Sequence, residues 1–257
     1  MVEVCVGTGG NLALLLEACA AAGIGLDWSG LELDPQPLAL ALASEAFRRT
    51  WHPPTLTLLE RLRDDGHWRS ETSCGQMLWG DARQSLAALV RERAGRLDLV
   101  WHDAFSPRRC PQLWTVAGLG APGRLLAPAG RWISYTSAAA VRETLRGLGL
   151  HVMALEVHAS PARDAAEPPR QGSAWSGGTV ASPSPLDAGP LWRPLSAMER
   201  DHLASAAGEP YRDPSGMAAA ATILASRLTA QAEALARGTR ASSGAWRQRW
   251  GVGSPRQ

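Results

Sequence analysis

Near its start the chain reads Val2-Glu3-Val4-Cys5-Val6-Gly7-Thr8-Gly9-Gly10-Asn11-Leu12. The β-branched residues predict a short strand over residues 2–6, and the glycines stop it. Asn11 then opens an Ala- and Leu-rich helix that Gly23 closes. Glycines in such a turn let the backbone bend tightly and approach a ligand closely. A strand, a glycine turn and a helix in this order are typical of a parallel sheet that binds its ligand at the carboxyl ends of the strands.

The same alternation continues along the chain. Further strands are expected over residues 28–33, 76–79, 97–102, 131–136 and 151–158, with a seventh over 176–181. Helices are expected between them, over residues 35–47, 82–94, 114–126 and 138–148. Strands and helices that alternate at this spacing predict an α/β fold, with a doubly wound, mostly parallel seven-stranded sheet covered on both faces.

The carboxyl-terminal third departs from this pattern. The α/β unit is expected to end near residue 185, and residues 186–238 are expected to form a helical extension, with helices over 196–207 and 215–236. The last residues, 239–257, carry Arg and Trp and are expected to be disordered. Residues 159–175 are rich in Pro, Ala and Asp, which is typical of either a lid or a disordered connection.

Composition excludes several classes of function. The chain has 257 residues and a net charge of +2, and all 26 of its basic residues are Arg. Without Lys there is no Schiff-base chemistry and no P-loop. The four cysteines and six histidines lack metal-ligand spacing, so no metal is expected. The most apolar stretch, residues 12–26, is too short to span a membrane, and there is no signal peptide. We therefore expect a cytoplasmic protein; its oligomeric state is not predicted.

Three consecutive strand ends carry residues suited to a nucleoside. Leu12 stands where a dinucleotide fingerprint needs its third glycine, so the turn favours an adenosyl ligand without a pyrophosphate. Glu32 ends the second strand, where an acid can accept hydrogen bonds from both ribose hydroxyls, and Asp81 follows the third strand, near an adenine amino group. Either acid alone could equally be a helix N-cap or a solvated loop residue. Together the three strand ends predict an adenosyl site.

The fourth strand ends in Asp103-Ala104-Phe105-Ser106-Pro107. A carboxylate beside a flat apolar wall suits methyl transfer to an amine, which must be neutral, aligned with the methyl donor and offered a proton acceptor. An Asx-type turn with a packed Phe would give the same residues.

Residues 103–115 as a whole, DAFSPRRCPQLWT, resemble the D-G-F-A-P-x-x-N-P-x-x-W-T signature of the MnmC-type methyltransferases. These S-adenosylmethionine-dependent enzymes finish the 5-methylaminomethyl group on the wobble uridine of tRNA. The resemblance continues at residues 3–12, which follow the family's E-T-G-F-G-T-G-x-N-F, at Gly80-Asp81 and at residues 135–138. It covers roughly residues 1 to 158 and implies a Rossmann-like class I methyltransferase fold.

The resemblance also implies roles for individual residues. Asp103 becomes the catalytic carboxylate beside the transferred methyl, and Phe105 and Pro107 would shape the aminomethyl pocket. S-adenosylmethionine would be held by Glu3, Gly7, Gly9 and Asn11 at its methionine part, by Glu32 at its ribose and by Asp81 at its adenine. The implied partner is the anticodon loop of tRNA. Arg108 and Arg109 are the favoured contacts for it, with Arg48, Arg49 and the Arg/Trp tail as further candidates.

Three departures from the family leave alternatives open. Cys5 replaces a motif glycine, Cys110 replaces an Asn, and the chain starts at the first strand, whereas the family has an earlier segment on the substrate side. We therefore also consider a methyltransferase acting on another amine, perhaps a small molecule, and a catalytically silent member that binds cofactor or RNA. A nicotinamide dehydrogenase ranks last, because Leu12 breaks the fingerprint and no catalytic Lys or Tyr pattern is present.

Overall fold

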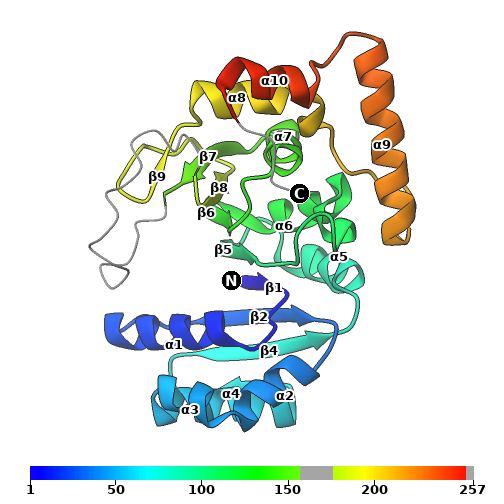
Figure 1. Ribbon diagram of the computed structural model, residues 1–257. Coiled ribbons are helices and arrows are strands. Elements are labelled where there is room, and N and C mark those ends of the chain that lie inside the picture. Colours follow the sequence, from blue (N-terminus) through cyan, green and yellow to red (C-terminus); the bar gives the residue numbers. More distant parts are fainter. Residues whose placement is uncertain (157–175, 253–257) are drawn as a thin grey trace.

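A nine-stranded sheet runs through the centre of the molecule (Figure 1), as seen in a computed structural model that describes residues 1–156 and 176–252. Its strand order is β3-β4-β2-β1-β5-β6-β8-β7-β9. The strands are β1 Val2–Val4, β2 Asp27–Glu32, β3 His67–Arg69, β4 Cys74–Trp79, β5 Leu97–His102, β6 Leu126–Ser134, β7 His151–Leu155, β8 Gly178–Ser182 and β9 Trp192–Arg193. The central strands β4, β2, β1, β5 and β6 are parallel, and β8 lies antiparallel between β6 and β7.

Helices cover both faces of the sheet. On one face α1 (Gly10–Ala22), α2 (Gln36–Ala43) and α4 (Pro53–Asp65) pack around Trp28. On the other face α5 (Ala82–Arg93), α6 (Val116–Leu125) and α7 (Ala139–Gly147) pack around Trp114 and Trp132. The central strands contribute to both cores, with Val2, Val4 and Val100 on one face and Trp28 and Met77 on the other. The predicted doubly wound α/β fold is confirmed.

The sheet has two strands more than predicted. All seven expected strands are present, and β3 and β9 add short antiparallel strands at the two edges. With three and two residues respectively, they are too short to show an alternating pattern in the sequence. Because β9 lies in the expected extension, the sheet continues past residue 185.

The helices also differ from expectation between residues 35 and 65. The single helix expected over 35–47 is broken at Ser44, whose hydroxyl caps a separate helix α3 (Glu45–Thr50). Helix α4 was not predicted, because the charged residues of its second half make this stretch of the sequence polar. Its signal is the spacing of Leu56, Leu59 and Leu62, all buried against the sheet, behind two prolines in the first turn.

The extension packs onto the α/β unit and shares its core. It comprises α8 (Ala197–Ala204), the short 3₁₀ helix η2 (Ala206–Gly208), α9 (Ala220–Ala236) and α10 (Ser243–Trp250). Another 3₁₀ helix, η1 (Pro111–Trp114), precedes α6 in the α/β unit. Tyr211 and Ile223 belong to the main core cluster. The buried Arg142 of α7 donates to the Glu199 carboxylate of α8 over 2.9 Å.

The expectation of a disordered tail is wrong for residues 239–252. Helix α10 lies beside α8 at the top of Figure 1. Its Trp246 is buried, stacks on His202 and donates to the Met198 carbonyl over 3.1 Å. Trp250 and Arg249 both bind the Asp201 carboxylate. The indoles therefore anchor the tail to α8, and Trp246 is not available to stack on bases.

Residues 159–175, expected to form either a lid or a disordered connection, lie outside the described residues, as do residues 253–257. In the part of the chain that is described, no helix has both the length and the apolar character needed to cross a bilayer. All four cysteines are free, and each is partly buried.

Candidate functional site

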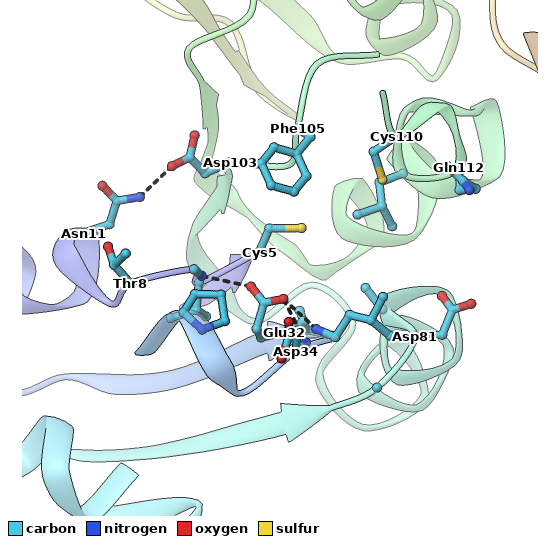
Figure 2. A pocket seen from close by; sticks show the side chains of 18 of the residues that line it. Cys5, Thr8, Asn11, Glu32, Asp34, Asp81, Asp103, Phe105, Cys110 and Gln112 are labelled. Atoms are coloured by element: carbon cyan, nitrogen blue, oxygen red, sulfur yellow. Dashed lines mark hydrogen bonds between the residues drawn. The ribbon is translucent and has the colours of Figure 1, made fainter. Parts of the chain in front are cut away.

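A cavity of about 610 Å³ lies at the carboxyl edge of the parallel strands. Because β1, β2, β4 and β5 are parallel, the segments that follow them meet there. They supply the glycine turn, residues 31–34, residues 80–83 and, from the segment after β5, Asp103, Phe105, Cys110, Gln112 and Leu113. The volume is in the range of small-molecule and cofactor sites. In Figure 2, Asn11 and Asp103 lie at one end of the cavity and Asp81 and Gln112 at the other.

The turn that joins β1 to α1 contains two left-handed glycines. Gly7 has φ +56° and Gly9 has φ +77°, which side chains rarely adopt. A Cβ at Gly7 would meet no atom within 4 Å, so the turn leaves bare backbone at the cavity wall. Gly9 itself is buried behind the cavity, where a Cβ would lie 3.0 Å from Leu38.

Cys5 takes the same left-handed conformation, with φ +67°, without being a glycine. The turn therefore accommodates Cys5 in place of the family's glycine, at the steric cost of a left-handed backbone with a side chain. Its thiol lines the cavity, and burial raises its pKa to about 12, so the group stays protonated.

Glu32 connects the second strand end to the glycine turn. One carboxylate oxygen accepts from the Gly7 amide over 2.8 Å, and the other accepts from the Leu33 and Asp34 amides over 2.7 and 3.2 Å. The carboxylate faces the cavity (Figure 2). Three backbone donors hold it in one orientation, and about one acceptor position remains for a ribose hydroxyl.

Asp103 and Asn11, 92 residues apart in sequence, are in direct contact. The Asn11 amide donates to Asp103 Oδ2 over 2.8 Å (Figure 2). Among the described residues no donor reaches Oδ1. The loop after Asp103 is held by two side chains: the Tyr135 hydroxyl donates to the Ala104 carbonyl over 2.8 Å, and the Trp114 indole donates to the Phe105 carbonyl over 2.7 Å. The motif aromatics thus fix the carboxylate at the strand end.

Glu3 is not part of the cavity wall. Its side chain is fully buried in β1, where Oε2 accepts from the Trp28 indole over 3.1 Å. Oε1 has no partner among the described residues. Burial raises its pKa to about 8, against hydrogen bonds from Trp28 and Asn11 that lower it. The structure therefore places Glu3 behind Asn11, as a neutral acid at neutral pH.

Asp81 both caps helix α5 and lines the cavity. Its side chain caps α5 by accepting from the Arg83 amide over 2.9 Å, as the N-cap alternative expected. It also lines the cavity, as the adenosyl prediction requires. The Arg83 guanidinium binds the same carboxylate and lowers its pKa.

Of the residues expected on the substrate side, Phe105, Arg108 and Arg109 lie at the cavity or next to it. Pro107, Arg48 and Arg49 do not. Phe105 lines the cavity and remains 67% exposed. Arg108 and Arg109 are exposed next to it, with the Arg109 guanidinium 4.9 Å from the Phe105 ring centre. Pro107 is buried and lies outside the cavity wall. Arg48 and Arg49 form ion pairs with Glu60 and Glu45 on the distant α3–α4 side.

The structure adds cavity residues to which the sequence analysis gave no role in the site: Thr8, Asp34, Arg83, Cys110 and Gln112. Arg83 follows Asp81 by two residues, and the N-cap pattern at Asp81 is the signal that could have found it. No group of three or more metal-ligating side chains occurs within residues 1–156 and 176–252.

Comparison with known proteins agrees with this site. Residues 62–160 match a family of S-adenosyl-L-methionine-dependent methyltransferases. Over 193 residues the chain is 30% identical to the tRNA 5-methylaminomethyl-2-thiouridine biosynthesis bifunctional protein MnmC of Chromobacterium violaceum. That match covers 71% of this chain, which spans 27% of the relative's length. The crystal structure of MnmC2 from Aquifex aeolicus has a TM-score of 0.69 at 26% identity, over 90% of this chain and 67% of that one.

A nucleoside-sized cavity at the switch from β1 to β5, together with the family match, defines an S-adenosylmethionine-dependent methyltransferase with a Rossmann-like class I fold. Within that class the chain is of the MnmC type. The sequence-based predictions of the family, the enzyme class and the cofactor are confirmed.

Proposed function

We propose that this methyltransferase acts on the amino nitrogen of the 5-aminomethyl group at the wobble uridine of tRNA. The observation that carries the proposal is the Asn11–Asp103 contact of 2.8 Å, in which the signature carboxylate is fixed at the cavity wall beside the exposed Phe105. The relative from Chromobacterium violaceum is a tRNA 5-methylaminomethyl-2-thiouridine biosynthesis protein, which supports tRNA as the substrate class.

The cofactor would lie along the cavity, with its methionine part near Asn11, its ribose at Glu32 and its adenine at Asp81. The bound cofactor supplies an electrophilic methyl group. Asp103 then orients the attacking amine through Oδ1 and accepts the proton that the nitrogen sheds once the new N–C bond has formed. The Asn11 amide keeps Oδ2 engaged, so the carboxylate cannot rotate away from the amine.

On the substrate side, Phe105 offers a flat apolar surface for the uridine, and Arg109 stacks on that ring. Arg108 and Arg109 are exposed and suited to phosphates of the anticodon loop. Such contacts make binding weaker as salt rises. A tRNA substrate would place the enzyme in the cytoplasm.

The first test of this proposal is calorimetric titration with S-adenosylmethionine. The wild-type chain is expected to bind it with micromolar affinity, about −8 kcal/mol. Glu32→Ala is expected to lose most of this affinity, because it removes the group that braces Gly7 and faces the ribose. Glu60→Ala, which breaks a surface ion pair with Arg48, is the matched control and should bind normally.

The second test is transfer of labelled methyl to tRNA that carries the unmethylated aminomethyl uridine. Incorporation that depends on the aminomethyl group is the expected result. A chain that binds the cofactor and methylates only small amines would contradict the tRNA assignment. Binding without any transfer would indicate a catalytically silent member.

A further inference from the structure

The Asp81 carboxylate is already held by a neighbour at the cavity. The Arg83 side chain reaches back over one turn, with Nε 3.1 Å from both carboxylate oxygens and Nη2 2.7 Å from Oδ2. With the Arg83 amide on Oδ1, three donors occupy the carboxylate. A carboxylate has about four acceptor positions, so one remains open.

The other side of the Arg83 guanidinium is fixed by the carboxyl-terminal extension. Nη1 donates to the Ala218 carbonyl over 3.2 Å and lies 3.6 Å from Asp213 Oδ2. These partners are about 130 residues away in sequence. The Arg83 side chain is 19% exposed, and that of Asp213 is 2% exposed, so the pair is shielded from solvent on the extension side.

The segment that holds Arg83 is itself rigidly organised. The Asp213 carboxylate accepts from the Ser215 hydroxyl over 2.6 Å and from the Gly216 and Ala218 amides, both over 3.0 Å. Just before it, the buried Tyr211 pairs with the end of the signature region, because the Val116 amide donates to the Tyr211 carbonyl over 3.0 Å. The extension is therefore fixed to the same loop that carries the site.

We propose that Arg83 and Asp213 are positioning residues through which the extension sets the recognition of adenine. The inference rests on the proposed placement of adenine at Asp81. A guanidinium fork fixes the plane of the carboxylate. The single acceptor position left on Asp81 then faces one donor, the 6-amino group of adenine. A base with oxygen at that position would present an acceptor to an acceptor and be rejected.

The test compares two ligands, S-adenosylhomocysteine and S-inosylhomocysteine, which differ by the 6-amino and 6-oxo groups. Both are titrated calorimetrically into the full chain. Asp213→Asn is expected to weaken the adenosyl ligand about tenfold and to leave the weaker inosyl ligand nearly unchanged. Asp81→Ser, which keeps an N-cap but removes the carboxylate, should have the same selective effect.

The double variant Asp81→Ser/Asp213→Asn shows whether Asp213 acts through Asp81. We expect it to bind no more weakly than Asp81→Ser alone, because the two changes remove one and the same interaction. Asp201→Asn is the matched control. It removes the ion pair between Asp201 of α8 and Arg249 of α10, which lies far from the cavity, and should leave both affinities unchanged.

Three outcomes separate the possible failures. If Asp81→Ser is selective but Asp213→Asn behaves like Asp201→Asn, the positioning role is overturned and the placement of adenine stands. If Asp213→Asn weakens both ligands equally, its role is structural only. If Asp81→Ser leaves both ligands unaffected, the placement of adenine is wrong. Should Asp213→Asn fail to fold, Arg83→Gln gives the same comparison, and Arg83→Lys is expected to fall between it and the wild type.

Discussion

The two carboxylates at the ends of the cavity, Asp103 and Asp81, have different partners. Asp103 meets a neutral amide, Asn11, on one oxygen only. Asp81 meets the charged fork of Arg83 on both oxygens and also caps a helix. Both follow parallel strands of the same sheet, and both belong to motifs that resemble the same family.

We propose that this difference separates a carboxylate that acts in turnover, Asp103, from one that acts in binding, Asp81. Arg83 lowers the pKa of Asp81, so this carboxylate stays ionised and fixed. Asp103 contacts only the neutral amide of Asn11, and among the described residues no donor reaches its Oδ1. The comparison predicts that changes at Asp103 alter turnover and that changes at Asp81 alter affinity.

The largest expected effect follows from Asp103→Asn. This change keeps the size of the side chain but removes the proton acceptor, so kcat should fall by 10²-fold or more, on the order of what general-base catalysis contributes. The affinity for S-adenosylhomocysteine should stay close to wild type. Asp98→Asn, on an exposed position of the same strand, is the control. A variant that turns over normally would remove Asp103 from the mechanism.

Asp81→Ser should give the opposite kinetic result. We expect KM for S-adenosylmethionine to rise about tenfold, as for a lost charged hydrogen bond, with kcat at saturating cofactor unchanged. Steady-state kinetics at varied cofactor concentration measures both. An equal loss in kcat and kcat/KM would mean that the two carboxylates do not differ as their partners suggest.

Glu3 extends the comparison to a third carboxyl, which is buried and neutral. Its folded-state pKa of about 8 lies above its unfolded value, so the folded chain holds a proton that the unfolded chain releases. The free energy of unfolding should therefore fall as pH rises toward 8. Glu3→Gln removes this dependence and should exceed the wild type by about 1 kcal/mol or more at pH 8.5.

Urea unfolding at pH 6.5 and 8.5 measures this effect. Burial lowers the pKa of His102 to about 3. His102 therefore makes the free energy of unfolding rise with pH between about 3 and 6.5, and it adds no pH dependence above that range. The Met1 amino group, whose pKa burial lowers, also contributes in the chosen window, but its contribution cancels in the difference between wild type and Glu3→Gln. Parallel pH profiles for wild type and Glu3→Gln would contradict a buried neutral acid.

The smallest effect is expected at Cys5, on the turn between the two ends. Cys5→Gly removes the steric strain of a left-handed residue with a side chain, but it also raises the conformational entropy of the unfolded chain. We expect a net gain of about 0.5–1 kcal/mol in the free energy of unfolding. Cys5→Val should destabilise, because β-branched residues tolerate this conformation least. Thermal unfolding of the three proteins gives the order, and a less stable glycine variant would show that the thiol packing outweighs the strain.

Much of the site could be predicted because its residues follow strand ends, which are local features of sequence. Glu32, Asp81 and Asp103 all reach the cavity for this reason, and the resemblance placed Asn11 beside them. Glu3 and Pro107 show the limit of this reasoning, since a motif gives a residue's neighbours in sequence but not which side of the backbone faces the ligand.

The contacts of the carboxyl-terminal third could not be read from the sequence. Arg83 meets Asp213 and Ala218, and Trp246 meets Met198, across separations at which no local pattern operates. Arg and Trp near a chain end suggested a disordered tail, whereas their long side chains supply the packing and hydrogen bonds that fix α10. Charge and aromatic content alone do not distinguish these outcomes.

The most direct test of the roles assigned to Asp103 and Asp81 is a crystal structure of the chain with S-adenosylhomocysteine. We predict the adenine 6-amino group within hydrogen-bond distance of Asp81, the ribose hydroxyls at Glu32 and the sulfur facing Asp103. A ligand bound in the reverse direction, or outside this cavity, would contradict the assignment of Asp103 to methyl transfer and of Asp81 to adenine.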